Sequence, residues 1–130
     1  MKRILVIDDD DHVRKLVRDI LERAGYVAID APNGEIGMRL YRMQPVDLII
    51  TDIFMPEKEG LETIRELLRD FPDAKIIAIS GGGMTGALSY LSLAKSFGAL
   101  RTLAKPFNRR ELLAAVGELL GTNDEPTAVD

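Results

Sequence analysis

Five short apolar runs alternate with amphipathic segments along the chain, and this alternation limits the possible folds more than any other feature. The runs lie at residues 4–7, 27–30, 46–51, 74–80 and 100–104. Short apolar runs bounded by polar turns are typical of buried strands. Strands that alternate with helices form βαβ units with right-handed crossovers. We therefore expect an α/β protein with a five-stranded parallel sheet and five helices distributed over both of its faces.

The expected helices begin and end at recognisable residues. Asp10 or Asp11 can cap the first helix, and Asn108 can cap the last. Gly25 and Gly121 suit the C-terminal ends of these two helices, because glycine readily adopts the left-handed backbone conformation common there. Three further helices are expected at residues 35–42, 60–71 and 85–97.

Apolar residues at helical spacing predict which side of each helix is buried. In the first helix these residues are Val13, Leu16, Val17, Ile20, Leu21 and Ala24. In the second they are Ile36, Leu40 and Met43. The strand signal at residues 27–30 is weaker than that of the first apolar run, so we expect this strand at an edge of the sheet.

Length and composition narrow the class of protein. The chain has 130 residues and a net charge of −4. This length suits one domain, which we place at residues 1–121, followed by a polar and disordered tail at residues 122–130. The charge disfavours nonspecific nucleic-acid binding, and the absence of cysteine excludes disulfides and thiolate metal sites. No apolar run approaches a membrane span. We expect a cytoplasmic protein that binds neither nucleic acid nor membrane.

Polar residues stand at the C-terminal ends of four of the predicted strands. Asp8 and Asp9 follow the first strand, Asp52 ends the third, Ser80 ends the fourth and Lys105 follows the fifth. The C-terminal ends of parallel strands meet at one edge of a sheet, where open α/β sheets place their chemistry. We therefore expect these side chains to form one site.

The residue types in this site suit phosphoryl transfer. Carboxylates placed close together repel one another unless a cation joins them, and oxygen ligands with room for water suit Mg²⁺. Asp52 can act as a nucleophile and become an aspartyl phosphate. Lys105 can neutralise the phosphoryl oxygens together with Mg²⁺, and Ser80 can donate a hydrogen bond.

Each of these residues also has an ordinary structural role when taken alone. Asp10 and Asp11 are interpreted as helix caps or solvated residues, and His12 as an exposed residue of the first helical turn. A serine at a strand end commonly forms a turn, and a single lysine is commonly solvated. The functional interpretation therefore depends on the combination of strand-end residues.

That combination resembles the response-regulator receiver domain of two-component signalling, similar to the chemotaxis receiver, over about residues 3–120. The resemblance implies a flavodoxin-like, doubly wound fold with strand order 2-1-3-4-5. The motifs that carry it are Val6-Ile7-Asp8-Asp9, Thr51-Asp52 with Met55-Pro56 and Gly60, Ile79-Ser80-Gly81, and Lys105-Pro106-Phe107.

The same resemblance implies a role for each site residue. Asp52 is the phosphoacceptor and, with Asp9, binds Mg²⁺ directly, whereas Asp8 holds the ion through water. The backbone carbonyl of Phe54 completes the protein ligands. Ser80 matches the switch hydroxyl of the family. Lys105 matches its lysine, and the bond from Lys105 to Pro106 is expected to be cis.

Two positions depart from the family pattern. Thr102 stands where many members have a tyrosine or phenylalanine that swings inward on activation, which argues against an aromatic switch. Phe54 stands where a polar residue is common in members that hydrolyse their phosphoryl group quickly. Because a bulky apolar side chain can impede the attacking water, we expect a long-lived phosphoryl state.

The resemblance thus implies a phospho-accepting signalling switch of a two-component system or phosphorelay. A sensor histidine kinase or a histidine phosphotransfer protein supplies the phosphoryl group, and the domain assists only its own phosphorylation and dephosphorylation. A downstream protein partner meets the face formed by the fourth helix, fifth strand and fifth helix. Residues available to that partner are Arg101, Thr102, Arg109 and Arg110.

Several alternatives remain at this point. The chain can be a receiver-like docking module that works without phosphorylation, or the receiver fragment of a longer regulator. A flavodoxin-like cofactor binder is disfavoured, because Asp8 to Asp11 would repel a phosphate after the first strand. A metal-dependent phosphohydrolase is also disfavoured, because Phe54 occupies the position of its second acid.

Overall fold

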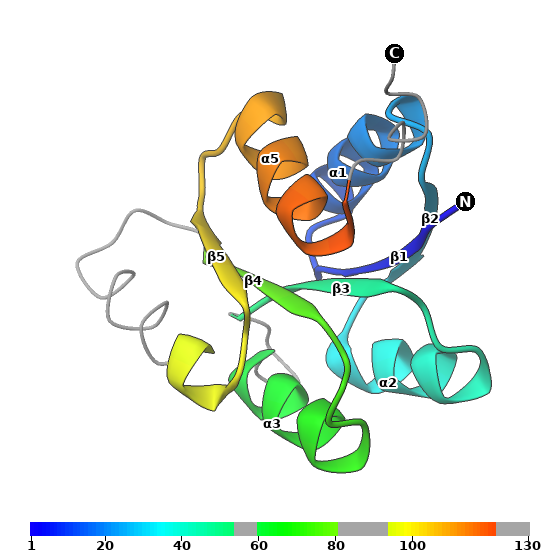
Figure 1. The fold of residues 1–130 in the computed structure, drawn as a ribbon, viewed down its shortest axis with the longest axis vertical. Coiled ribbons are helices and arrows are strands. Elements are labelled where there is room, and N and C mark those ends of the chain that lie inside the picture. Colours follow the sequence, from blue (N-terminus) through cyan, green and yellow to red (C-terminus); the bar gives the residue numbers. More distant parts are fainter. Residues whose placement is uncertain (54–59, 81–93, 122–130) are drawn as a thin grey trace.

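The computed structural model of the chain describes residues 1–53, 60–80 and 94–121. Five strands form one sheet in the order β2-β1-β3-β4-β5, and every neighbouring pair is parallel (Figure 1). The predicted sheet is confirmed, with the second strand at an edge. The strands are β1 (Arg3–Ile7), β2 (Val27–Ala31), β3 (Leu48–Asp52), β4 (Ile76–Ser80) and β5 (Arg101–Ala104).

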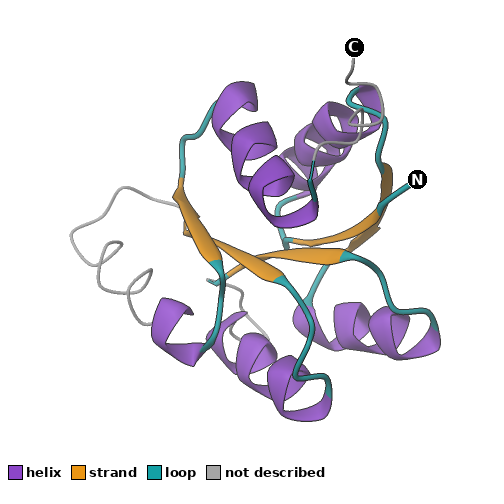
Figure 2. Ribbon diagram, in the orientation of Figure 1, coloured by secondary structure: helices purple, strands orange, loops and turns teal. Residues whose placement is uncertain are grey.

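Helices cover both faces of this sheet, as the alternating pattern predicts. Helices α1 and α5 lie on one face, and α2 and α3 lie on the other (Figure 2). Residues 94–97 are also helical and belong to the fourth helix, predicted at residues 85–97. The bounds of the other four are α1 (Asp11–Arg23), α2 (Gly34–Met43), α3 (Gly60–Asp70) and α5 (Arg109–Leu120).

The sheet separates two apolar cores because successive side chains of a strand point to opposite faces. In β1, Leu5 and Ile7 join the core under α2 and α3, whereas Ile4 and Val6 join the core under α1 and α5. Strands β3 and β4 are buried along their whole length. Their continuous apolar sequences reflect a parallel sheet covered on both sides.

The predicted helix ends are confirmed at several places. Asp10 is the N-cap of α1, and Gly25 follows that helix with a φ of 96°. Asn108 caps α5 in a reciprocal capping box with Glu111. Gly121 ends the same helix with a φ of 75°, in the left-handed region that favours glycine.

Two residues assigned to the cores lie instead on the surface. Leu16 is 57% exposed and Met43 is 76% exposed. Leu16 lies about 100° around α1 from the buried Val17, at the margin of the apolar stripe. In α2, Ile36 and Leu40 are partly buried and pack against the core as predicted. The fully buried residues of this helix are Gly34, Gly37, Met38 and Tyr41.

Gly37 explains why the most deeply buried stripe of α2 was missed. A Cβ atom at this position would lie 2.4 Å from Cδ1 of Ile7, so only glycine allows α2 to approach β1 this closely. The helix therefore buries a stripe that includes glycines, and a search for large apolar residues cannot detect such a stripe.

Several predictions concern residues outside the described parts of the chain. These are the metal-binding carbonyl of Phe54, Gly81 of the Ile79-Ser80-Gly81 motif, most of the helix at residues 85–97 and the tail at residues 122–130. Among the helices that the structure describes, none is long and apolar enough to cross a membrane.

Candidate functional site

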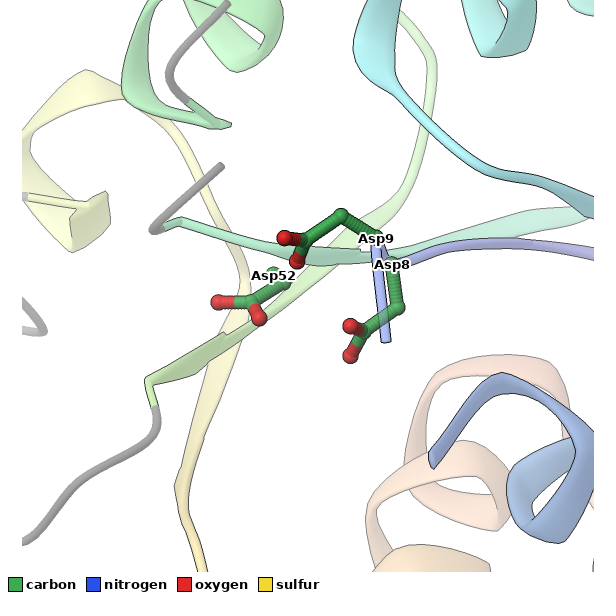
Figure 3. Close-up of side chains that lie close together, drawn as sticks. All are labelled: Asp8, Asp9 and Asp52. Atoms are coloured by element: carbon green, nitrogen blue, oxygen red, sulfur yellow. The ribbon is translucent and has the colours of Figure 1, made fainter. Parts of the chain in front are cut away.

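Three carboxylates gather at the C-terminal edge of the sheet, as predicted (Figure 3). Ile7 pairs with Thr51, so Asp8 and Asp52 are the next residues of two neighbouring strands. Oxygen atoms of Asp8, Asp9 and Asp52 lie within 4.8 Å of one another. Asp8 and Asp52 are buried, with exposed fractions of 2% and 5%, whereas Asp9 is exposed.

Lys105 supplies the cation that these carboxylates require. Its Nζ donates to Oδ2 of Asp8 at 3.1 Å and to Oδ2 of Asp52 at 3.2 Å. Burial lowers the pKa of Lys105, but the charges of Asp52 and Asp8 and their hydrogen bonds raise it by more than burial lowers it. The pKa of Lys105 therefore lies above its ordinary value. Lys105 is therefore a cation at neutral pH. Its bond to Pro106 is cis, as the resemblance implies.

Asp8 is held at both its backbone and its side chain. Its N–H donates to the carbonyl of Ala31 at 3.2 Å, and its Oδ1 accepts from the N–H of Asp10 at 2.9 Å. With Lys105 on Oδ2, each of its carboxylate oxygens has a donor. Asp8 is thus fixed in place before any ligand arrives.

The remaining acids of this loop have structural roles, as predicted. Asp10 accepts from the N–H groups of Val13 and His12, and these hydrogen bonds lower its pKa. Asp11 is exposed and pairs with Arg14. His12 is also exposed. Only the first two of the four acids therefore face Asp52.

Ser80 brings a hydroxyl to the same edge from the end of β4. The residue is 1% exposed, and its Oγ has no hydrogen-bond partner within the described ranges. A buried polar atom without a partner is unfavourable. Ser80 therefore holds a donor that can bond a ligand oxygen.

Arg14, which the sequence interpretation did not include, also reaches this site. Its Nη1 donates to the backbone carbonyl of Asp8 at 2.8 Å, and its Nε donates to Asp30 Oδ2 at 3.0 Å. Its Nη2 donates to Asp11 at 2.6 Å. An arginine one helical turn after an acidic loop could have indicated a contact with that loop. Its hydrogen bond to Asp30 could not be predicted, because it depends on where β2 lies.

The donor set fits a hard divalent cation. Within the described residues, the candidate metal ligands are all carboxylate oxygens. The positive charge of Lys105 offsets one of their three negative charges. Mg²⁺ favours such oxygen ligands and keeps several waters. Asp8, Asp9 and Asp52 therefore provide a suitable site for Mg²⁺.

Comparison with known proteins assigns the family. Residues 4–117 match the family described as "Response regulator receiver domain". The chain is 34% identical to the chemotaxis protein CheY of Thermotoga maritima over 91% of this chain and 97% of that protein. It is 36% identical to the response regulator receiver protein CpdR of Brucella abortus over 92% of this chain and 98% of that protein.

A solved structure shows the same fold. The response regulator protein TrrA from Thermotoga maritima, crystallised in complex with Mg(2+)-BeF, has a TM-score of 0.82 and 38% identity, covering 92% of this chain and all of that one. The chain therefore belongs to the family of response regulator receiver domains of two-component systems. Domains of this family are switch modules rather than conventional enzymes.

Proposed function

We propose that residues 1–121 form a phosphorylation switch in which Asp52 accepts a phosphoryl group from a phosphohistidine. The donor is a sensor histidine kinase or a histidine phosphotransfer protein of a two-component system or phosphorelay. The observation that carries the proposal is the buried Asp52 carboxylate, which is bonded to Lys105 and clustered with Asp8 and Asp9. Ser80 ends the neighbouring strand, and its buried hydroxyl has no partner among the described residues.

In the proposed reaction, a carboxylate oxygen of Asp52 attacks phosphorus. An oxygen–phosphorus bond forms while the phosphorus–nitrogen bond to the donor histidine breaks, and the imidazole nitrogen keeps the electron pair. Lys105 carries the positive charge that stabilises the phosphoryl oxygens. Asp8, Asp9 and Asp52 would hold Mg²⁺ with the carbonyl of Phe54, and the bound ion would neutralise further negative charge.

The same geometry supports a switch. The Oγ of Ser80 can donate to an oxygen of the new phosphoryl group, which draws the end of β4 toward Asp52. The carbonyl of Ser80 accepts from the N–H of Lys105 at 2.8 Å, so this movement is transmitted to the end of β5. We propose that it alters the face of β5, α5 and the preceding helix that meets a downstream partner.

The residues proposed for partner contact lie on this face. Arg101, Arg109 and Arg110 are exposed, and Thr102 is partly buried. Arg101 donates to Glu118 at 2.8 Å, which links β5 to α5. Because Thr102 has no aromatic ring to reorient, we propose that the signal passes through the hydrogen bond between Ser80 at the end of β4 and Lys105 after β5.

The central experiment is intact-protein mass after incubation with acetyl phosphate or a phosphorylated phosphotransfer protein. We expect a phosphoryl adduct that requires Mg²⁺, resists acid, is removed by base and is absent from Asp52→Asn. If no donor labels a protein that does bind Mg²⁺, the chain is a docking module and the proposal is wrong.

The lifetime of the adduct is a second measurable property. We propose that Phe54 slows hydrolysis by excluding the attacking water, and Phe54→Asn is expected to increase the decay rate of phosphoryl-Asp52 about tenfold. The decay is followed after the donor is removed. An unchanged decay rate would show that Phe54 does not control water access.

A further inference from the structure

The guanidinium of Arg14 bonds three separate parts of the molecule. Its side chain is 16% exposed and contacts the acidic loop at Asp8, the end of β2 at Asp30 and the first turn of α1 at Asp11. Burial lowers the pKa of Arg14, but the hydrogen bonds to Asp11 and Asp30 raise it by more, so the pKa lies above its ordinary value. Arg14 is therefore a permanent cation with a fixed orientation.

The acceptor on Asp8 gives this contact its importance. The carbonyl of Asp8 belongs to the peptide unit that joins Asp8 to Asp9, and these residues supply two of the three clustered carboxylates. Rotation of this peptide unit would move the Asp9 side chain relative to Asp52. The N–H of Asp8 is held by Ala31, so Arg14 provides the second backbone hydrogen bond that fixes the loop.

We propose that Arg14 is a positioning residue for the acidic cluster. Arg14 fixes the peptide unit between Asp8 and Asp9 so that both carboxylates face Asp52. Asp30 orients the guanidinium for this task. The inference rests on the proposed function, because it assigns the metal affinity of that same site to a residue that does not touch the ion.

Shape, rather than charge alone, makes arginine suitable at this position. A planar guanidinium directs its N–H groups along fixed directions and can bond three acceptors at once. A lysine ammonium has the same charge but cannot reach Asp8, Asp30 and Asp11 together. Arg14→Lys therefore removes the orientation while it keeps the positive charge on α1.

Arg18 provides a matched control. It lies one turn further along α1 and donates to the same Asp30, at 3.3 Å, but within the described residues it makes no hydrogen bond to the acidic loop. Arg18→Lys repeats the substitution on the same helix beside the same partner. If Arg14 acts only through helix charge, the two variants should behave alike.

The test measures Mg²⁺ affinity by titration calorimetry on the unphosphorylated protein. Groups that orient metal ligands typically change affinity 10- to 100-fold when removed, so we expect Arg14→Lys to bind Mg²⁺ about tenfold more weakly. Arg18→Lys is expected to stay within about twofold. Asp30→Asn should weaken binding as well, because it removes the partner that orients the Arg14 guanidinium. Adding Asp30→Asn to Arg14→Lys should cause little further loss, because both changes act through the hydrogen bond between Arg14 and the Asp8 carbonyl.

A second readout needs no metal. The N–H of Asp10 donates to Oδ1 of Asp8, so its hydrogen-exchange rate reports how firmly the loop is held. This amide should exchange faster in metal-free Arg14→Lys than in Arg18→Lys. Thermal unfolding confirms that each variant is folded.

The outcomes separate the inference from the function on which it rests. If the wild-type protein does not bind Mg²⁺, the proposed function itself fails. If wild type binds Mg²⁺ and Arg14→Lys binds it equally well, the positioning role is wrong and the proposed function stands. Equal losses in Arg14→Lys and Arg18→Lys would also overturn the inference, since they would show a general charge effect.

Discussion

The two sides of the acidic site differ in how completely their hydrogen bonds are formed. On the β1 side, Asp8 has a partner at its N–H, its carbonyl and both carboxylate oxygens. On the β4 side, the buried hydroxyl of Ser80 has no partner in the part of the chain that the structure describes. One side is organised before a ligand arrives, and the other has a bond still to make.

This difference suits the two tasks proposed for the site. Ligands that are already fixed bind an ion with little loss of conformational entropy. A buried donor without an acceptor raises the free energy of the resting state, and an arriving phosphoryl oxygen relieves that cost. We therefore assign ion binding to the β1 side and the response to phosphorylation to the β4 side.

The largest predicted effect comes from removing Lys105, the cation between the two sides. Its side chain is 19% exposed, and it bonds two carboxylates that are 3% and 6% exposed. Lys105→Met leaves these charges without their cation. Removing one partner of a fully buried ion pair costs about 3–5 kcal/mol. Because Lys105 is partly exposed, we expect the free energy of unfolding to fall by about 2 kcal/mol in the absence of Mg²⁺.

Urea unfolding at pH 7, with and without Mg²⁺, measures this effect. Mg²⁺ should restore part of the lost stability, because it can replace the missing positive charge. Lys75→Met is a matched control, since Lys75 is an exposed lysine whose ammonium donates to the carbonyl of Leu119 and to no carboxylate in the described part of the chain. The control should change stability by about 0.5 kcal/mol or less. Similar losses in both variants would contradict the electrostatic explanation.

The pH dependence of the same ion pair is expected to be smaller and confined to alkaline solution. The pKa of Lys105 is raised above the ordinary value of 10.5, because the favourable effect of Asp52 and Asp8 exceeds the opposing effect of burial. A raised pKa in the folded protein stabilises the fold below the unfolded value, and this contribution is lost as pH rises through the folded value. The stability difference between wild type and Lys105→Met should therefore stay constant to about pH 10 and decrease above it.

Paired urea titrations from pH 7 to pH 11 test this dependence without Mg²⁺. Subtracting the two curves removes the titration of groups common to both proteins. A difference that falls already between pH 7 and pH 9 would show that Lys105 is not the titrating group.

The sequence was sufficient to locate the site because parallel strands carry their end residues to one edge. Asp8, Asp52, Ser80 and Lys105 each stand at or just beyond the end of a strand, so predicting the strands also placed these residues together. The strand order fixed the remaining geometry. It puts β1, β3 and β4 side by side, and Lys105 reaches from beyond β5 to Asp52 and Asp8.

The features that escaped prediction depend on distances between elements. Apolar spacing did not reveal that Gly37 lets α2 approach Ile7, so Met43 was wrongly placed in the core. The role of Arg14 was missed for a similar reason. A long side chain on α1 meets Asp30 only because β2 lies beside β1, and sequence spacing does not give that direction.

The smallest effect on the resting protein is expected at Ser80, and it tests the comparison most directly. Since the Oγ has no described partner, Ser80→Ala removes a buried polar group without breaking a bond. The unphosphorylated variant should be as stable as wild type, or more stable by up to about 1 kcal/mol. On the β1 side, Arg14→Lys should instead disturb the resting protein.

The effect of Ser80→Ala should appear only after phosphorylation. Ser80 pairs with Ala104, so β5 amides report the movement of the β4 end. Phosphorylation should change hydrogen exchange at residues 101–104 in wild type and in Ser80→Thr, which keeps the hydroxyl, but not in phosphorylated Ser80→Ala. If the alanine variant is destabilised at rest, Ser80 is already bonded there. An undiminished exchange change would place the response elsewhere, and the division between an organised side and a responsive side would be wrong.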